Sequence, residues 1–303
     1  MTYLDMSIGF PKLGITIDNL PKNINVFGIS IAFYGIIISI GILTGYLLAQ
    51  LQAKRTKQSA ELYLDYAMYL IVASILGARA YYVIFSWDYY KEDLIQILNF
   101  RAGGLAIYGG IIAGFITTVI FAKVKKLSFL LMGDTVCAGL AMGQAIGRWG
   151  NFFNREAFGR YTDSLFTMQL KVTEVSQSVL KNNQEYIDKM VNINGTDYIQ
   201  VHPTFLYESV SCLLIAIIIL VLTKYRKCNG QLLGVYMICY GMVRFFIEGL
   251  RTDQLLLWNT NIAVSQIVSL CVVAGGILIE IRCLYLIKNG KGIVKDKAKK
   301  EEN

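Results

Sequence analysis

Seven long apolar stretches constrain this chain more than any other feature of its sequence. They cover residues 27–51, 63–87, 103–122, 127–147, 205–222, 232–250 and 262–281. Crossing a hydrocarbon core of roughly 30 Å takes about 20 helical residues, and each stretch is close to that length. Because lipid offers no hydrogen-bond partner to the backbone, each stretch must be a helix. The sequence therefore predicts an all-α membrane protein with seven transmembrane helices.

The composition and the first residues agree with a membrane chain that keeps its N-terminus. Of the 303 residues, 55% are hydrophobic and only 17% are charged, which is unlike a soluble domain. Before the first stretch, Lys12 and Lys22 balance Asp5 and Asp18, whereas a cleaved secretion signal begins with a basic segment. We therefore expect the first stretch to remain in the mature protein.

Basic residues mark one side of the predicted bundle. They follow the first, third, fifth and seventh stretches: Lys54, Arg55 and Lys57; Lys123, Lys125 and Lys126; Lys224, Arg226 and Lys227; Arg282, Lys288, Lys291 and the tail sequence KDKAKK. By the positive-inside rule this side is the cytoplasm, so the N-terminus is predicted outside and the C-terminus inside. Anchoring to an anionic inner leaflet then explains the net charge of +8, and we expect the lipid bilayer, not nucleic acid, as a partner.

The sequence predicts five parts. They are an extracytoplasmic N-terminal arm (1–26), transmembrane helices 1–4 (27–150), a small extracytoplasmic head of short strands and turns between helices 4 and 5 (151–204), transmembrane helices 5–7 (205–287) and a basic cytoplasmic tail (288–303). Six cysteines lie within the stretches or near their cytoplasmic ends, without disulfide or zinc spacing. We expect them to be packing residues, and we expect no metal and no cofactor.

Charged residues inside the apolar stretches are the first functional signal, because an Arg, Lys or Asp costs roughly 2.5–3.5 kcal/mol at a helix centre. These residues are Arg79, Asp134, Glu208, Arg244 and Glu248. With the predicted orientation, all but Asp134 lie toward the outer leaflet, where Tyr108 and Arg148 join them. The pattern predicts a polar, cationic cavity between helices at the level of the outer lipid headgroups.

The arginines at this depth favour a phosphate-bearing ligand, because a planar guanidinium binds phosphate through two parallel hydrogen bonds. Tyr34 and Tyr240 would add hydroxyl groups to the same cavity. Arg244 and Glu248 are spaced i, i+4, so mutual neutralisation explains that pair equally well. Gly109 and Gly110, in the string GGLAIYGG, leave space either for a ligand or for close helix packing, and both explanations stay open.

Several motifs resemble those of bacterial prolipoprotein diacylglyceryl transferases. They are GRWGNFFNREAFGR (147–160), LGAR and YYVIF around Arg79 (76–79 and 81–85), GGLAIYGG (103–110), HPTFLYE (202–208) and RFFIEGLR (244–251). The motifs occur in the family's order and cover most of the chain from the first stretch to the sixth. The resemblance implies a seven-helix enzyme of the bacterial inner membrane whose active site faces the outer leaflet.

The resemblance also implies a reaction and its partners. The diacylglyceryl group of phosphatidylglycerol passes to the thiol of the lipobox cysteine in a preprolipoprotein signal peptide, and glycerol phosphate is released. No enzyme cysteine is required, since the acceptor brings its own thiol. Such a reaction needs a bound phosphate leaving group and a deprotonated thiol.

Carried onto this sequence, the resemblance assigns roles to individual residues. Arg148 and Arg244 are expected to hold the phosphate, with Arg79 a weaker candidate that is also explained as structural. The expected catalytic residues are Arg148, Arg244, Tyr108 and Glu248, and the expected substrate-binding residues are Arg148, Asn151, Asn154, Glu156, Gly159, Tyr34, Arg79, Tyr240, Gly109 and Gly110. Among these, the two asparagines and Glu156 would orient the headgroup or the arginines, and Gly159 would leave room for a close backbone approach.

One position departs from the family pattern. Many members have His-Gly-Gly where this chain has Tyr-Gly-Gly, so the residue often proposed as the base is Tyr108 here. A phenol ionises near pH 10 and is a poor base at neutral pH, although it donates a hydrogen bond. The chain's only histidine, His202, precedes a proline in a loop, which favours a structural role. The identity of the base stays open.

Two other classes of protein compete with the transferase. A multispan carrier for an organic anion would also contain buried arginines and glycine-interrupted helices. A membrane scaffold without chemistry would not need charge at this depth. The carrier is therefore the main alternative, and release of glycerol phosphate from phosphatidylglycerol only in the presence of a lipobox peptide separates the two.

Overall fold

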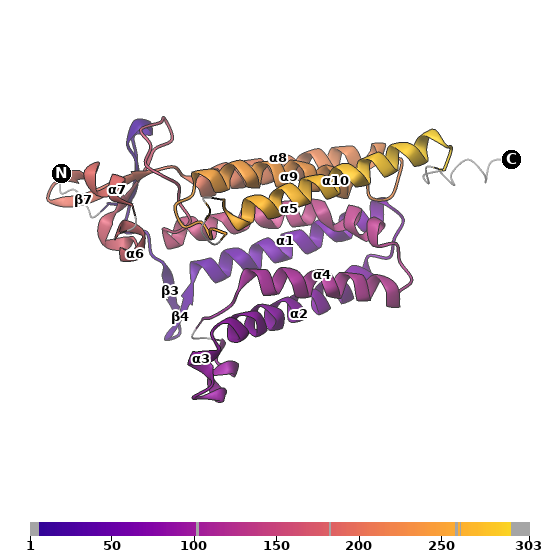
Figure 1. The fold of residues 1–303 in the computed structure, drawn as a ribbon, viewed down its shortest axis with the longest axis horizontal. Coiled ribbons are helices and arrows are strands. Elements are labelled where there is room, and N and C mark those ends of the chain that lie inside the picture. Colours follow the sequence, from indigo (N-terminus) through magenta and orange to yellow (C-terminus); the bar gives the residue numbers. More distant parts are fainter. Residues whose placement is uncertain (1–5, 101–102, 182, 258–259, 261, 292–303) are drawn as a thin grey trace. The chain divides into compact units, whose positions relative to one another are not determined.

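The computed structural model describes residues 6–100, 103–181, 183–257, 260 and 262–291. The chain forms two compact units, of which the first comprises residues 1–45 and 137–303 and the second comprises residues 46–136. Helices α1 (Phe33–Arg55) and α5 (Phe129–Asn154) contribute to both units. Figure 1 shows the ribbon coloured along the sequence.

Seven helices in the described part of the chain are long and apolar enough to cross a membrane, which confirms the predicted fold class. They are α1, α2 (Glu61–Phe85), α4 (Ile107–Val124), α5, α8 (Thr204–Leu222), α9 (Gln231–Leu250) and α10 (Val264–Lys288). The short η5 (Thr223–Tyr225) extends α8. Many exposed side chains of these helices are large and apolar, as expected for surfaces that face lipid. The chain is a multi-pass membrane protein.

In the first unit, α9 packs along α8 and α10, and these helices run side by side in Figure 1. The core that α5, α8 and α9 share is built from small and aliphatic residues, among them Ala138, Ala216 and Leu232. Within α1 and α5, a Cβ atom added at Gly139 would lie 2.2 Å from the carbonyl oxygen of Gly45. Glycine therefore lets these two backbones touch.

The head of the first unit is a five-stranded antiparallel sheet in the order β2-β1-β5-β7-β6. Its strands are β1 (Met6–Phe10), β2 (Ile15–Asp18), β5 (Met168–Lys171), β6 (Val191–Ile193) and β7 (Thr196–Val201). Ile8 of β1 pairs with Leu170 of β5. The N-terminal segment, expected as a separate arm, thus supplies two strands of the head. Ile8, Leu170 and Ile199 are buried in its core.

Short elements complete the first unit. They are η1 (Pro11–Leu13), η4 (Val172–Glu174), α6 (Gln177–Lys181), α7 (Gln184–Asp188) and a separate hairpin of β3 (Asn23–Val26) and β4 (Ile29–Ala32) that leads into α1. Short strands are expected between the fourth and fifth membrane helices, and the structure has β5, β6 and β7 there, together with η4, α6 and α7.

Several helix boundaries differ from the sequence prediction, among them the start of α1 and the end of α5. The first apolar stretch is predicted to start at residue 27, but α1 begins at Phe33. Phe27 and Gly28 adopt positive φ angles of 49° and 80° that a right-handed helix does not contain, and the next four residues form β4. The fourth stretch is predicted to end at residue 147, and the head to begin at 151, but α5 continues to Asn154. The apolar stretch therefore ends seven residues before helix α5 does.

The second unit contains α2, α4, parts of α1 and α5, and the short α3 (Trp87–Tyr90) and η2 (Leu94–Leu98). Helices α2 and α4 make extensive contact. A Cβ atom added at Gly109 would lie 2.3 Å from the carbonyl oxygen of Gly77 and 2.4 Å from Cβ of Tyr81. The two backbones therefore approach as closely as glycine allows.

Candidate active site

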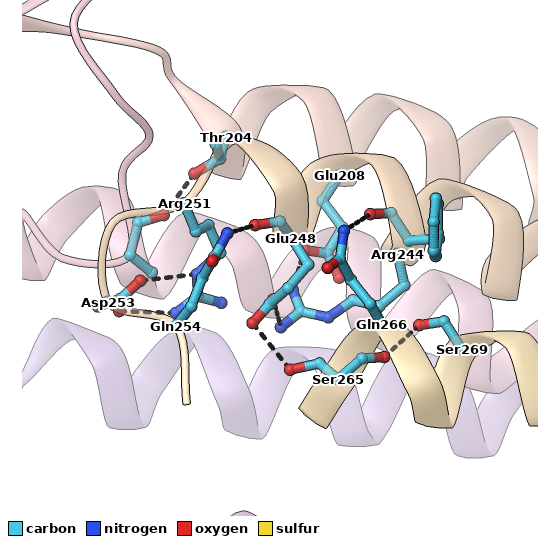
Figure 2. Close-up of polar contacts among 12 residues, drawn as sticks. Thr204, Glu208, Arg244, Glu248, Arg251, Asp253, Gln254, Ser265, Gln266 and Ser269 are labelled. Carbon is cyan, nitrogen blue, oxygen red and sulfur yellow. Dashed lines mark hydrogen bonds and ion pairs between the residues drawn. The ribbon is translucent and has the colours of Figure 1, made fainter. Parts of the chain in front are cut away.

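Three helices of the first unit bring four charged side chains together. Arg148 belongs to α5, Glu208 to α8, and Arg244 and Glu248 to α9. Arg148 Nη2 lies 2.7 Å from Glu208 Oε1, and Arg244 Nη1 lies 3.2 Å from Glu208 Oε2. Arg244 Nη2 lies 2.5 Å from Glu248 Oε2. These four residues form one continuous ion-pair chain, and Figure 2 shows its part from Glu208 to Glu248.

Burial differs between the two signs of charge in this ion-pair chain. The side chains of Glu208 and Glu248 are 2% and 3% exposed, whereas those of Arg148 and Arg244 are 22% and 17% exposed. Buried carboxylates must be paired, because removing an ion from water is costly. The two guanidinium groups meet that need and keep an accessible side.

Both glutamates accept further hydrogen bonds. The Tyr240 hydroxyl donates to Glu208 Oε1 over 3.4 Å. The Ser265 hydroxyl of α10 donates to Glu248 Oε1 over 2.8 Å, as Figure 2 shows. The structure contains the i, i+4 pair of Arg244 and Glu248 that the sequence spacing allows. Arg244 also binds Glu208, so neutralisation within α9 describes only half of its contacts.

The end of α5 extends this polar set. Arg148 Nη1 donates to Asn151 Oδ1 over 3.2 Å, and the side-chain amides of Asn151 and Asn154 both donate to Glu156 Oε1, over 3.0 and 3.3 Å. The chain reverses here because Arg155 has a φ angle of 54° and Ala157 one of 56°. This turn brings Glu156 back to the end of its own helix. Four of the predicted site residues are thus connected.

Arg155 holds this turn from the inside of the head. Its buried guanidinium donates to the carbonyl oxygens of Phe153 and Leu20, and its Nε lies 2.6 Å from Glu174 Oε2. Burial lowers the pKa of Arg155, and the carboxylate of Glu174 opposes that shift. Arg155 therefore ties the end of α5, the N-terminal segment and the head at the residue before Glu156.

Gly159 lies where three segments meet. Its N–H donates to the carbonyl oxygen of His202 over 3.0 Å, and its own carbonyl accepts from the Tyr186 hydroxyl over 2.8 Å. A Cβ atom added here would lie 2.8 Å from Cβ of His202 and 2.9 Å from the carbonyl oxygen of Leu250. The protein's own backbone makes the close approach at Gly159. Burial raises the pKa of Tyr186 to about 12, so its hydroxyl stays protonated and donates.

Two further residues have defined surroundings in the first unit. The ring of Tyr34 lies against α5, since a Cβ atom added at Gly150 would be 2.8 Å from its Cδ2 atom. The Nδ1 atom of His202 lies 3.2 Å from the Tyr207 hydroxyl, and burial lowers the pKa of this histidine. The contact of the His202 ring with Tyr207 supports the structural role that the sequence favours.

Arg79 has different surroundings, in the second unit. A guanidinium carries five N–H groups, and those of Arg79 bind five backbone carbonyl oxygens. Nε donates to Ile97 over 2.9 Å, Nη1 to Gly103 and Gly104 over 2.6 and 3.0 Å, and Nη2 to Gln96 and Asn99 over 2.6 and 3.1 Å. The guanidinium also lies over the rings of Tyr90 and Phe100. This geometry favours the structural explanation, and phosphate binding by Arg79 stays a prediction.

Three predicted site residues open helix α4, also in the second unit. Tyr108 is half-buried. The space beside Gly109 is filled by Gly77 and Tyr81, and a Cβ atom added at Gly110 would lie 3.4 Å from the carbonyl oxygen of Ser74. Of the two explanations that the sequence leaves open for these glycines, the structure contains close helix packing. Their role in substrate binding stays a prediction.

Comparisons with known proteins agree with the motifs. A family model described as prolipoprotein diacylglyceryl transferase matches residues 21–282. Three similar relatives carry the name phosphatidylglycerol–prolipoprotein diacylglyceryl transferase. That of Finegoldia magna is 43% identical over 259 residues, which cover 85% of this chain and 93% of the relative. That of Clostridioides difficile is 40% identical over 271 residues (89% and 97%), and that of Listeria innocua is 41% identical over 253 residues (84% and 86%). The chain belongs to the prolipoprotein diacylglyceryl transferase family.

Sequence reasoning about this family member missed several residues of the site. Glu208 was noted as a charge within an apolar stretch but was not assigned to the site, although it binds both arginines. Its signal was present, because a buried carboxylate needs a cationic partner. Arg155 stands in the motif of residues 147–160 but has no role assigned from it. Tyr186 and Ser265 give no comparable signal, since each acts through a contact with a distant segment.

The site of this transferase family member contains no arrangement of metal ligands in the part of the chain that the structure describes. There, no group of three or more His, Cys, Asp or Glu side chains is placed to hold a metal ion.

Proposed function

We propose that this chain is a phosphatidylglycerol–prolipoprotein diacylglyceryl transferase, which catalyses the first step of bacterial lipoprotein maturation. One observation carries the proposal. This chain, a member of the prolipoprotein diacylglyceryl transferase family, holds two partly accessible arginines, from α5 and α9, against one buried carboxylate. The same set of groups suits a reaction in which a phosphate ester leaves. The acceptor is the thiol of a lipobox cysteine in a preprolipoprotein signal peptide.

The proposed reaction is a substitution at carbon. The thiolate sulfur attacks the diacylglyceryl carbon that carries the phosphate ester of phosphatidylglycerol. A C–S bond forms, the C–O bond to the phosphate breaks, and the electron pair of that bond stays on the oxygen of glycerol phosphate. The proton of the thiol passes to a base or to the leaving phosphate. Since the leaving group gains a negative charge as the bond breaks, cations beside it lower the barrier.

Arg148 and Arg244 are suited to stabilise this leaving group. Glu208 binds both guanidinium groups, one through each of its oxygens, and so fixes their separation. Planar guanidinium groups bind phosphate oxygens through paired hydrogen bonds. Before phosphate binds, Glu208 and Glu248 compensate the two cations, which lowers the cost of burying them. In this mechanism Glu248 acts by holding Arg244.

The remaining predicted residues are assigned to substrate positioning. Asn151, Asn154 and Glu156 continue the polar set from Arg148 and would bind the glycerol hydroxyls of the headgroup. Tyr34 and Tyr240 supply hydroxyl groups beside the same helices. Gly159 keeps the adjoining backbone close. Arg79, Tyr108, Gly109 and Gly110 are retained as weaker candidates, with Tyr108 as a hydrogen-bond donor to the headgroup.

The site is proposed to face the outer leaflet of the bacterial inner membrane, because the four basic clusters of the sequence identify the opposite side as the cytoplasm. Single cysteines at the exposed positions Asn192, in the head, and Lys227, after η5, test this orientation in a cysteine-free background. An impermeant maleimide applied to intact cells is expected to label only the cysteine at position 192. The opposite labelling would place the site on the cytoplasmic side.

A reconstituted assay tests the reaction. Purified protein, phosphatidylglycerol and a lipobox peptide are expected to yield glycerol phosphate and a thioether-linked peptide in equal amounts. A matched peptide with serine in place of the lipobox cysteine should yield neither. An organic-anion carrier, the alternative function, would move glycerol phosphate across a sealed vesicle without consuming phosphatidylglycerol. Transport without thioether product would therefore contradict the transferase and favour the carrier.

A further inference from the structure

The β3-β4 hairpin before α1 has two chemically different faces. Ile24 pairs with Ile31 and Val26 with Ile29, whereas Asn23 pairs with Ala32 and Asn25 with Ser30. Successive side chains of a strand point to opposite faces, and directly opposed residues share a face. One face of the hairpin therefore carries the four aliphatic side chains, and the other carries the polar ones.

The aliphatic face is not covered by any described residue. All residues of both strands are exposed, and the four aliphatic side chains are between 37% and 57% exposed. An isolated two-stranded hairpin is marginal in water, because it buries too little apolar surface to offset the loss of conformational entropy. The alternation of apolar and polar residues thus gives the hairpin an exposed apolar face, which is suited to contact a partner outside the described chain.

The tip of the hairpin points to the same conclusion. Phe27 and Gly28 form a two-residue turn between Val26 and Ile29, and both have positive φ angles. Such turns favour Asn, Asp or Gly at the first position, because bulky side chains are strained there. Phe27 instead places an aromatic ring at this position, and its side chain is 101% exposed. In water this residue is unfavourable both in conformation and in hydration.

The position of the hairpin identifies what covers it. The N–H of Phe33, the first residue of α1, donates to the carbonyl oxygen of Lys22 over 2.9 Å, and the Phe33 ring stacks on Phe153 near the end of α5. The base of the hairpin is therefore fixed at the point where a membrane-spanning helix begins. In Figure 1, β3 and β4 run across the direction of α1 rather than along it. A segment that starts at a helix end and runs across the helix follows the membrane surface.

We propose that the β3-β4 hairpin is an interfacial membrane anchor, with its aliphatic face and Phe27 in the headgroup and acyl boundary of the leaflet at which α1 begins. The polar face, with Asn23, Asn25 and Ser30, faces water. The partner is the lipid bilayer, because the hairpin continues directly into a bilayer-spanning helix and its two strands carry no charged residue. The anchor holds the first turn of α1, with Tyr34, at a fixed depth. It does not depend on the proposed transfer reaction.

Depth-dependent fluorescence tests the anchor. The variants Phe27→Trp and Ile29→Trp place a reporter on the tip and on the aliphatic face, and the matched control Asn25→Trp places one on the polar face. Each is compared with the parent, which has three tryptophans, in nanodiscs of phosphatidylglycerol and phosphatidylcholine. The reporters at positions 27 and 29 are expected to be quenched by acyl-brominated lipid and to be at least threefold less quenched by aqueous iodide than the reporter at position 25.

Three outcomes would overturn the anchor. Equal iodide quenching at positions 25, 27 and 29, without quenching by brominated lipid, would place the hairpin in water. Protection from iodide that appears only after a lipobox peptide is added would make the peptide the partner. Protection that appears only in discs loaded with two copies would make the partner a second chain. Phe27→Asn controls for folding: in detergent it should melt no lower than the parent, since asparagine favours this turn.

Discussion

Arg79 in the second unit and the pair Arg148 and Arg244 in the first are alike in sequence and opposite in surroundings. All three arginines lie in apolar helices. The N–H groups of Arg79 are used by five backbone carbonyl oxygens of residues 96–104. Arg148 and Arg244 instead share the carboxylate of Glu208, and each keeps part of its side chain accessible.

The difference teaches that the partner, together with the burial, separates an arginine with a structural environment from the two that we propose to bind phosphate. Carbonyl groups are neutral and belong to a fixed backbone, so Arg79 gives shape to the segment between α2 and α4. A carboxylate is charged, and its ion pair with a guanidinium is an exchangeable contact that an incoming phosphate can replace. The free-energy cost of placing an arginine within a membrane helix is the same in both cases, so the sequence alone does not separate them.

The largest expected effect is the loss of Arg148. Arg148→Ala should reduce initial rates by about 10²–10³-fold, as removal of a group that stabilises developing charge does in other enzymes. Arg148→Lys keeps the charge but loses the paired hydrogen bonds, so it should retain a rate between those of the alanine variant and the parent. Glycerol phosphate release from phosphatidylglycerol at fixed peptide measures both.

The control for this substitution is Arg55→Lys, on an exposed arginine at the end of α1. It should leave rate and melting temperature unchanged. A fully active Arg148→Lys enzyme would show that the fork geometry of the guanidinium is irrelevant, and the assignment would then weaken to general electrostatics.

Arg79 should give the opposite signature. A lysine offers three N–H groups in place of five, so Arg79→Lys leaves at least two carbonyl groups without a partner, at a cost of about 1–3 kcal/mol each. We expect a large fall in melting temperature in detergent, while the rate per folded molecule changes by less than about threefold, since a structural group acts on folding rather than on the transition state. A stable variant with a much reduced rate would move Arg79 to the site and break the comparison.

The sequence predicted the membrane helices better than it predicted the partners of the charges. Hydropathy located seven helices because lipid imposes the same requirement on every span. It also located Arg148, Arg244 and Glu248, since charge is rare at such depth. It could not show that Glu208 joins Arg148 to Arg244, because those contacts connect α5, α8 and α9, which no local pattern links. The motif resemblance supplied the family but not this geometry.

The head shows the same limit in another form. Its short strands were expected, but the pairing of β1 with β5 joins residues about 160 positions apart in sequence. The start of α1 was also misplaced, because residues 27–32 are as apolar as a helix that spans the membrane. Phe27 and Gly28 have positive φ angles and residues 29–32 form strand β4, so none of the six belongs to the helix, and apolar composition does not report backbone conformation.

Tyr108 tests whether the second unit takes part in chemistry. If its hydroxyl only holds the headgroup, Tyr108→Phe should raise the KM for phosphatidylglycerol by about tenfold, the effect of one lost hydrogen bond of about 1.4 kcal/mol. Higher lipid fraction or higher pH should then recover much of the rate. Tyr108→His restores the commoner family residue and should be tolerated. The measurement is initial rate against pH and lipid fraction for the three enzymes.

Two results would change that assignment. A Tyr108→Phe enzyme that stays inactive when the acceptor thiol is supplied already ionised would make Tyr108 the proton acceptor. An inactive but correctly inserted Tyr108→His enzyme would mean that the family motif cannot be carried over at this position.

Arg155 tests the same comparison within the first unit, and we expect a smaller effect. It pairs with the carboxylate of Glu174, which is not a member of the ion-pair chain. Arg155→Gly relieves the positive φ angle but removes the ion pair and the hydrogen bonds to Phe153 and Leu20, so the net loss of stability should be about 2–4 kcal/mol. The rate should fall several-fold, because Glu156 follows directly and loses a fixed orientation. Thermal melting and the dependence of rate on lipid separate the two effects, with Glu174→Gln as the matched variant.

The two variants separate the contacts of Arg155. Glu174→Gln breaks only the ion pair, whereas Arg155→Gly also removes the hydrogen bonds to Phe153 and Leu20, so Glu174→Gln should lower the rate in the same direction but less. A normal rate in Arg155→Gly would show that the turn holds Glu156 without the ion pair.

The smallest expected effect concerns His202, which tests whether a group near the ion-pair chain is chemical or structural. Burial lowers the pKa of this histidine in the folded protein, so the unfolded chain binds a proton more readily than the folded one. Its contribution to stability is therefore present above the unfolded pKa, near 6.5, and is lost as the pH falls from there through the lower folded pKa. His202→Gln should remove that part of the pH dependence, and at pH 8 it should change stability by about 0.5 kcal/mol or less. Because the ring contacts Tyr207 rather than Glu208 or the arginines, the rate should stay within about twofold of the parent at every pH. Melting curves measure the stability and initial rates measure the activity, each from about pH 5.5 to about pH 8, the range in which histidine titrates. A rate that collapses in His202→Gln while the melting temperature holds would make this histidine the missing base, and it would place a chemical role on a ring whose hydrogen-bond partner is Tyr207 of its own segment.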